Sequence, residues 1–143
     1  MIARTSLITL IFSFHLKEIV TVPDADAEEL LEIAALVESH SNHPIGLSIT
    51  NAYEGTLDQS RLRKLEEIPG HGIRAEVDDD IILLGNSKLL AKFEVPMEVA
   101  HGIGTIVYMA KNDVYQGYFE IADTLKPEAS HALEELHEAG VQD

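Results

Sequence analysis

A glutamate and a histidine lie five residues apart around one predicted turn, and together they can recognise a flat aromatic ligand. Glu38 ends a segment with helical periodicity, and His43 directly precedes Pro44. Because proline suits the first position of a helix, Pro44 predicts that a second helix begins there, with His43 at its corner. The imidazole face and the carboxylate acceptor suit adenine, which has a π-face and an exocyclic amino donor. Since His-Pro pairs mark many ordinary turns, this pair alone leaves turn and site both open.

Two glycine-containing segments are predicted to meet at one end of a β-hairpin. Gly70 and Gly72 open its first strand, and Gly85 with Asn86 closes its second. Glycine lets a ligand approach the backbone and leaves N–H groups free for phosphate or ribose oxygens. A single Gly-x-Gly is more often a turn than a site. This one does not lie between a parallel strand and a long helix, which argues against a Rossmann site.

The composition favours one acidic domain. The chain has 143 residues, no cysteine and a formal net charge of −15. Without cysteine there is neither a disulfide nor a thiolate metal site, and the negative charge disfavours nucleic acid and anionic membranes as partners. The longest apolar run, residues 6–14, is too short to span a bilayer. We therefore expect a soluble chain without direct membrane contact.

The first half of the chain predicts a strand followed by two helices. Residues 6–22 favour a strand, and Asp24 or Asp26 can cap the helix that follows. The helical period of that helix predicts a buried face formed by Leu30, Ile33, Ala34 and Val37. The second helix is expected from Pro44 to about Tyr53, with Gly55 as its stop and an apolar face of Ile45, Ile49 and Ala52. Residues 56–67 show little pattern.

The second half predicts two hairpins and two further helices. The first hairpin turns at residues 78–80 and ends at Gly85, and a short helix over 87–93 follows, capped by Asn86 or Ser87. The second hairpin covers residues 104–121 with a turn at 111–113, and a last helix is expected from Pro127 to Ala139. This order predicts an α+β fold, a mainly antiparallel sheet of about six strands flanked by helices.

Four groups of residues occur in the order and spacing of a known family: Glu38 with Ser41-Asn42-His43-Pro44, Pro69-Gly70-His71-Gly72-Ile73, Leu84-Gly85-Asn86, and the run from Gly104 to Pro127. Together they resemble the nucleotide-binding domain of heavy-metal-transporting P-type ATPases. The resemblance covers roughly residues 12 to 143. It implies ATP as the ligand, with Mg²⁺ bound to the nucleotide.

The resemblance also implies a role for each matching residue. Glu38 would contact the adenine amino group, and His43 would stack on the adenine or orient it. The loop beside the nucleotide and the neighbouring strand would be formed by Gly70, Gly72, Ile73, Gly85 and Asn86. Asn42 and Gly46 stand where the family usually has glutamate and alanine, and neither change is expected to remove one of these contacts.

The resemblance divides the chain into three parts. Residues 1–11 are expected to be altered or added in cloning, because residues 3–10 do not match the family's D-K-T-G-T-L-T phosphorylation motif. Residues 12–122 would form the nucleotide-binding domain, and residues 123–143 the start of the phosphorylation domain. The partners implied are the phosphorylation and membrane domains of a parent transporter, in which this domain would be cytoplasmic. The chain alone is not expected to hydrolyse ATP, and its short connection between Asn86 and Thr105 resembles zinc/cadmium-type members more than copper ones.

Other functions remain open at this stage. The seven histidines allow a metal-binding module, although their spacing favours scattered surface residues. A phosphatase of the related haloacid dehalogenase type would need a D-x-D nucleophile. Asp78-Asp79-Asp80 contains that string and also suggests Ca²⁺, but these residues are predicted to form a turn. A non-catalytic interaction domain without a small ligand is a further alternative.

Overall fold

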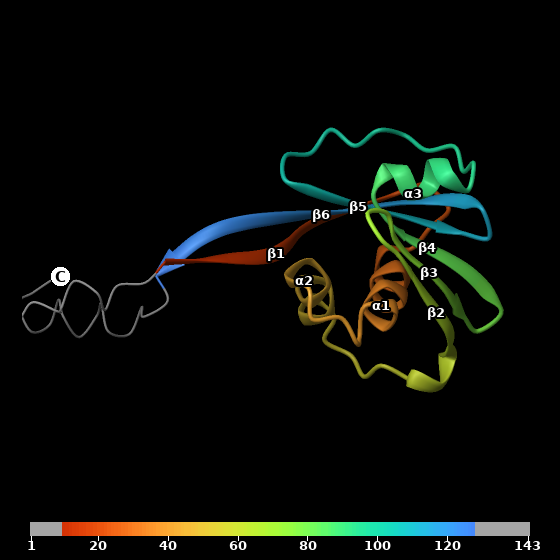
Figure 1. Ribbon diagram of the computed structural model, residues 1–143, viewed down its shortest axis with the longest axis horizontal. Coiled ribbons are helices and arrows are strands. Elements are labelled where there is room, and N and C mark those ends of the chain that lie inside the picture. Colours follow the sequence, from red (N-terminus) through yellow and green to blue (C-terminus); the bar gives the residue numbers. More distant parts are fainter. Residues whose placement is uncertain (1–9, 128–143) are drawn as a thin grey trace, which may run out of the picture. The chain divides into compact units, whose positions relative to one another are not determined.

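The computed structural model describes residues 10–127, of which Phe14–Ala122 form one compact unit (Figure 1). The other described residues, 10–13 and 123–127, are strand residues of a second unit. Residues 1–9 lie outside the described part of the chain. So does almost all of the helix predicted from Pro127 to Ala139. Within residues 10–127 no helix is long and apolar enough to cross a membrane.

The core of the fold is a six-stranded sheet with the strand order β1-β6-β5-β4-β3-β2. Its strands are β1 (Leu10–Thr21), β2 (Leu62–Ile68), β3 (Gly72–Val77), β4 (Asp80–Gly85), β5 (Thr105–Lys111) and β6 (Val114–Pro127). Each neighbouring pair from β2 to β6 is antiparallel. The predicted α+β fold with a mainly antiparallel sheet is confirmed.

Helices cover both faces of this sheet (Figure 1). The helices α1 (Ala27–Val37) and α2 (Pro44–Ala52) lie on one face, and α3 (Ser87–Lys92) lies on the other. The predicted apolar face of α1 is buried as expected, whereas of the predicted apolar face of α2 Ile49 is fully buried and Ile45 and Ala52 are half-buried. Two apolar clusters result, one between the sheet and α1–α2 and a smaller one beneath α3.

The structure corrects the boundaries of several predicted elements. Asp26 occupies the N-cap position of α1, but its side chain accepts no capping hydrogen bond. Helix α2 ends at Ala52, within one residue of the predicted end at about Tyr53, where the backbone is already extended. Strand β6 continues beyond the predicted end of the second hairpin, to Pro127.

Strand β2 was not predicted, although it forms the edge of the sheet next to β3. A short 3₁₀ helix, η2 (Gln59–Arg61), leads into it. The five central residues of β2 are exposed, so their sequence has no need of alternating apolar residues. Strand β2 is defined by its backbone ladder to β3. It lacks the alternation of buried and exposed residues that marks a half-buried strand.

Candidate functional site

All seven predicted site residues line one cleft with a volume of about 540 Å³, namely Glu38, His43, Gly70, Gly72, Ile73, Gly85 and Asn86. The cleft lies where the α1–α2 turn, the β2–β3 loop and the ends of β4 and β5 meet. A cleft of this size suits a small organic ligand. The structure thus brings the predicted residues together, while their contacts with a ligand remain a prediction.

His43 is held in place as the N-cap of α2. Its Nδ1 accepts a hydrogen bond from the Ile45 N–H at 3.2 Å, and its own N–H donates to Ser41 Oγ at 3.1 Å. Because Nδ1 is an acceptor, a neutral His43 ring carries its proton on Nε2. The side chain is exposed at the rim of the cleft. His43 therefore has a structural role that the sequence analysis missed, and its ring is also available to a ligand.

Glu38 is the C-cap of α1, and its half-buried carboxyl lies against the first turn of α2. A Cβ atom added at Gly46 would lie 2.7 Å from Glu38 Oε1. Alanine at position 46, which the sequence analysis treated as neutral for the predicted contacts, would therefore displace this carboxyl. Burial first, and then the like charge of Glu67, raise the pKa of Glu38 to about 7.

Glycine is favoured at each position of the hairpin end for a different structural reason. Gly72 pairs with Gly85 across β3 and β4, and a Cβ at either position would overlap a backbone oxygen, that of Leu84 or of His71. These two glycines are therefore required by strand packing whether or not a ligand binds. Gly70 has a φ of +77°, and a Cβ there would meet nothing within 4 Å. Its turn geometry favours glycine, and the space around it is open to a ligand.

Both polar groups of the Asn86 side chain bind to the protein itself. Asn86 Oδ1 accepts a hydrogen bond from the Leu89 N–H and caps α3, which confirms one of the two caps predicted. Asn86 Nδ2 donates to the Gly70 carbonyl oxygen at 2.9 Å. The main role of this side chain in the structure is thus to hold the glycine loop against the end of β4.

Two titratable residues of the cleft, Glu67 and His71, were not among the predicted site residues. Glu67 lies opposite Ile73 in the β2–β3 ladder, and both residues line the cleft. Predicting β2 would have placed Glu67 beside Ile73. His71 Nδ1 lies 3.0 Å from the Pro69 carbonyl oxygen, which can only accept, so the proton of this bond belongs to Nδ1.

The cleft carries no strong positive charge. Its lining includes two glutamates and two histidines but neither lysine nor arginine within the described residues. A triphosphate inside the cleft would therefore lack a fixed cation, whereas a neutral base and sugar would not need one. The arrangement suits the base and ribose of a nucleotide better than its phosphates.

The alternative sites of the sequence analysis have structural explanations. Asp78 binds the Arg61 guanidinium at 2.9 Å, and Asp80 Oδ1 accepts a hydrogen bond from Asn112 Nδ2 at 2.8 Å. Both aspartates therefore stabilise connections between elements, and Asp78 and Asp79 form the predicted turn between β3 and β4. No group of three or more metal-binding side chains is found over residues 10–127.

Comparison with known proteins decides the family. A family model described as haloacid dehalogenase-like hydrolase matches residues 9–142. The chain belongs to this family. It is 39% identical over 130 residues to a zinc-transporting ATPase of Synechocystis and 38% identical over 130 residues to a cadmium, zinc and cobalt-transporting ATPase of Bacillus subtilis. Each alignment covers 91% of this chain and 18% of the relative, so this haloacid dehalogenase-like chain spans about a fifth of their length.

Solved structures confirm the fold. The N-domain of HMA6, a copper-transporting P-type ATPase, matches with a TM-score of 0.60 and 22% identity over 76% of this chain and 98% of that domain. A zinc-transporting PIB-type ATPase matches with a TM-score of 0.62 and 26% identity, over 90% of this chain and 22% of that protein. The predicted resemblance to the N-domain of heavy-metal-transporting P-type ATPases is confirmed.

Proposed function

We propose that this chain binds ATP as the nucleotide-binding domain of a heavy-metal-transporting P-type ATPase. The observation that carries the proposal is that all seven predicted residues line one cleft of ligand size. The CPx-ATPase CopB-B, whose catalytic domain changes conformation upon nucleotide binding, supports it with a TM-score of 0.58 over 91% of this chain.

In this proposal the cleft binds the base and the ribose. The exposed ring of His43 at the rim stacks on adenine, and Glu38 faces the adenine amino group. Gly70 gives the sugar and the α-phosphate access to the backbone. Because the cleft lining formed by residues 10–127 lacks lysine and arginine, the outer phosphates and their Mg²⁺ leave the cleft toward a phosphorylation domain of the parent transporter.

The transported metal is proposed to be zinc or cadmium. The relatives named for zinc, or for cadmium, zinc and cobalt, are 33% to 39% identical to the chain, against 32% for a copper-exporting P-type ATPase of Staphylococcus aureus. The short connection between α3 and β5 agrees with this choice. Residues 123–143 are proposed to begin the phosphorylation domain, and the membrane domain of the transporter is the further partner.

Titration of the 143-residue chain with ATP and GTP at pH 6.5 and pH 8.5, followed by amide NMR, tests the binding function. We expect ATP to shift signals of residues 38–46, 70–73 and 85–86, with a Kd of roughly 0.1 to 1 mM. At pH 8.5, where Glu38 is largely ionised, GTP should bind more weakly than ATP, since the Glu38 carboxylate would face the guanine carbonyl. If ATP shifts none of these signals, the chain is better explained as an interaction domain without a nucleotide. Equal affinity for ATP and GTP at pH 8.5 would refute the assignment of Glu38.

A further inference from the structure

Two carboxyl groups face the same cleft from different elements of the fold. Glu38 comes from the end of α1, and Glu67 comes from β2. The other titratable side chains of the lining are His43 at the start of α2 and His71 in the β2–β3 loop, and no lysine or arginine lines this part of the described chain. A negative charge on both glutamates would therefore lack a fixed counter-charge.

The surroundings of Glu38 disfavour its charged form in several ways. Its carboxyl is half-buried, and among the described residues no side-chain or backbone donor forms a hydrogen bond with it. Its backbone lies at the negative C-terminal end of α1, whose last turn contains no basic residue, whereas its carboxyl lies against the positive N-terminal turn of α2, so the two helix dipoles act on it in opposite directions. Burial and the charge of Glu67 raise the pKa of Glu38 to about 7.

We propose that the cleft recognises adenine through the neutral carboxylic acid of Glu38, which burial favours first, and that Glu67 is a positioning residue that adds to this effect. The proposal rests on the proposed nucleotide-binding function. A carboxylic acid offers one O–H donor and one carbonyl acceptor side by side. The edge of adenine offers N1 as an acceptor and the 6-amino group as a donor, so the two groups can form a pair of hydrogen bonds. A carboxylate can use only the amino group and turns a lone pair toward N1.

This pairing makes binding depend on pH. The apparent affinity scales with the fraction of molecules in the competent, protonated form. With a Glu38 pKa of about 7, that fraction falls about tenfold between pH 6 and pH 8, and the affinity falls by up to the same factor, because the carboxylate form keeps only the bond to the amino group. Adenosine is the suitable probe, because it has no phosphate that titrates in this range or attracts a protonated histidine.

Calorimetric or NMR titration of the full chain with adenosine at pH 6, 7 and 8 tests the proposal. Glu38→Gln is the decisive variant, since an amide offers a donor and an acceptor in the same places at every pH. We expect its affinity to be flat across this range and higher than that of the wild-type chain at pH 8. A pH slope that persists in Glu38→Gln would assign the effect to the histidines and overturn the proposal. So would a wild-type chain whose measurable affinity does not change with pH, although the proposed function would then stand.

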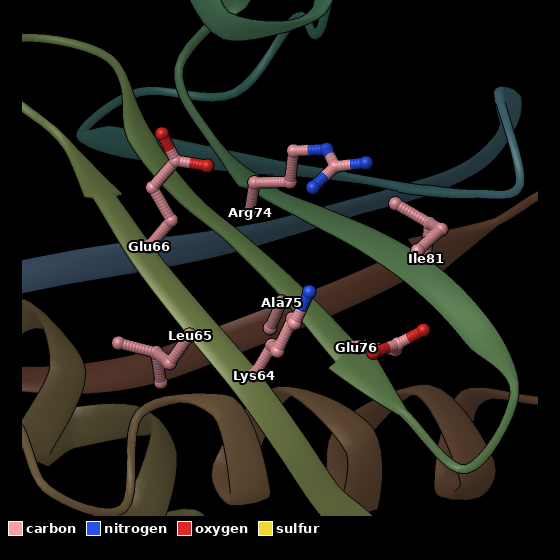
Figure 2. Close-up of a pocket in the computed structure, with 7 residues that line it drawn as sticks. All are labelled: Lys64, Leu65, Glu66, Arg74, Ala75, Glu76 and Ile81. Carbon is pink, nitrogen blue, oxygen red and sulfur yellow. The ribbon is translucent and has the colours of Figure 1, made fainter.

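Glu67→Gln and Glu66→Gln form a matched pair that tests the second half of the proposal. Both remove one negative charge from β2, but Glu66 pairs with Arg74 in the β2–β3 ladder and does not line the cleft. Figure 2 shows Glu66 and Arg74 pointing to the same side of the sheet, at a separate hollow. We expect Glu67→Gln to move the midpoint of the pH profile to lower pH and Glu66→Gln to leave it in place. Equal midpoints for the two variants would overturn the role of Glu67, and a chain that binds neither adenosine nor ATP at any pH would refute the proposed function as well.

Discussion

The carboxyl of Glu38 occupies the space that a side chain at Gly46 would need. An ideal Cβ on Gly46 would lie 2.7 Å from Glu38 Oε1 and 2.8 Å from Ser41 Oγ. The absence of a side chain in the first turn of α2 thus allows the end of α1 to bury a carboxyl group against it. This contact links two residues that are eight positions apart in the sequence. It makes the burial and the pKa of the Glu38 carboxyl depend on the glycine at position 46.

Gly46→Ala should change Glu38 more than it changes the fold. The added methyl group displaces the flexible end of the Glu38 side chain toward solvent, so the pKa of Glu38 should fall below 7. Alanine favours a helix over glycine by about 1 kcal/mol, which offsets the crowding, and we expect unfolding free energies within about 1 kcal/mol of wild type. A carbon-detected NMR titration of the Glu38 carboxyl measures the shift. Asn51→Ala, exposed and later in α2, is the control, and an unchanged Glu38 pKa in Gly46→Ala would contradict this reading of the contact.

Glu38→Gln should stabilise the chain at alkaline pH. The folded state raises the pKa of Glu38 to about 7, so the folded protein holds this proton more tightly than the unfolded chain. The contribution of this proton to the free energy of unfolding is fully present below the pKa of Glu38 in the unfolded chain, near 4.3. It is lost as pH rises through the folded-state pKa of about 7. Urea unfolding at pH 4.5 and pH 8.5 should therefore show little difference between variant and wild type at the lower pH. At the higher pH we expect a gain of about 1 to 3 kcal/mol for the variant. A gain of the same size at both pH values would show that charge is not its cause.

His43→Asn should separate capping from ligand binding. Asparagine is a strong N-cap and can replace His43 Nδ1 as the acceptor for the Ile45 N–H. We expect its stability within about 0.5 kcal/mol of wild type, and its affinity for adenosine at least about fivefold lower, because stacking contributes about 1 to 3 kcal/mol per base. His43→Gln should lose the cap as well and cost about another 0.5 to 1 kcal/mol of stability. Thermal melts and adenosine titrations of both variants measure the two effects, and an undiminished affinity in His43→Asn would exclude stacking.

Arg61 should matter for stability but not for ligand binding. Its guanidinium lies 2.8 Å from Glu32 Oε2 in α1 and 2.9 Å from Asp78 Oδ2 in the β3–β4 turn, outside the cleft. Lysine cannot form this two-sided set of hydrogen bonds, so Arg61→Lys should lower the free energy of unfolding by about 1 to 2 kcal/mol. Arg63→Lys, at an exposed position of β2 without an ion pair among the described residues, should cost less than about 0.5 kcal/mol. Urea unfolding and adenosine titration check both; reduced adenosine affinity in folded Arg61→Lys would show that Arg61 acts on the cleft.

Local sequence determined the elements whose residues carry a clear period or a turn signal. The buried stripe of α1, the start of α2 at Pro44 and the hairpin between β3 and β4 were all predicted, because each depends on neighbours within a few residues. The motifs around Glu38, Gly70 and Gly85 were sufficient to predict which residues would share a site, since their order and spacing resemble a family with this fold. The comparisons confirm that resemblance and the fold.

Only the tertiary structure decided how the charges of the cleft lie. Strand β2 has exposed residues on both faces, so the local sequence shows no period that predicts a strand. Its formation depends on the backbone pairing with β3. That ladder places Glu67 in the cleft with Glu38, twenty-nine positions earlier in the sequence. The raised pKa of Glu38 likewise requires burial against Gly46 and the like charge of Glu67, and both arise only when α1, α2 and β2 are packed together. Motifs in the sequence were therefore sufficient to predict which residues line the cleft, whereas the raised pKa of Glu38 is a property of the fold.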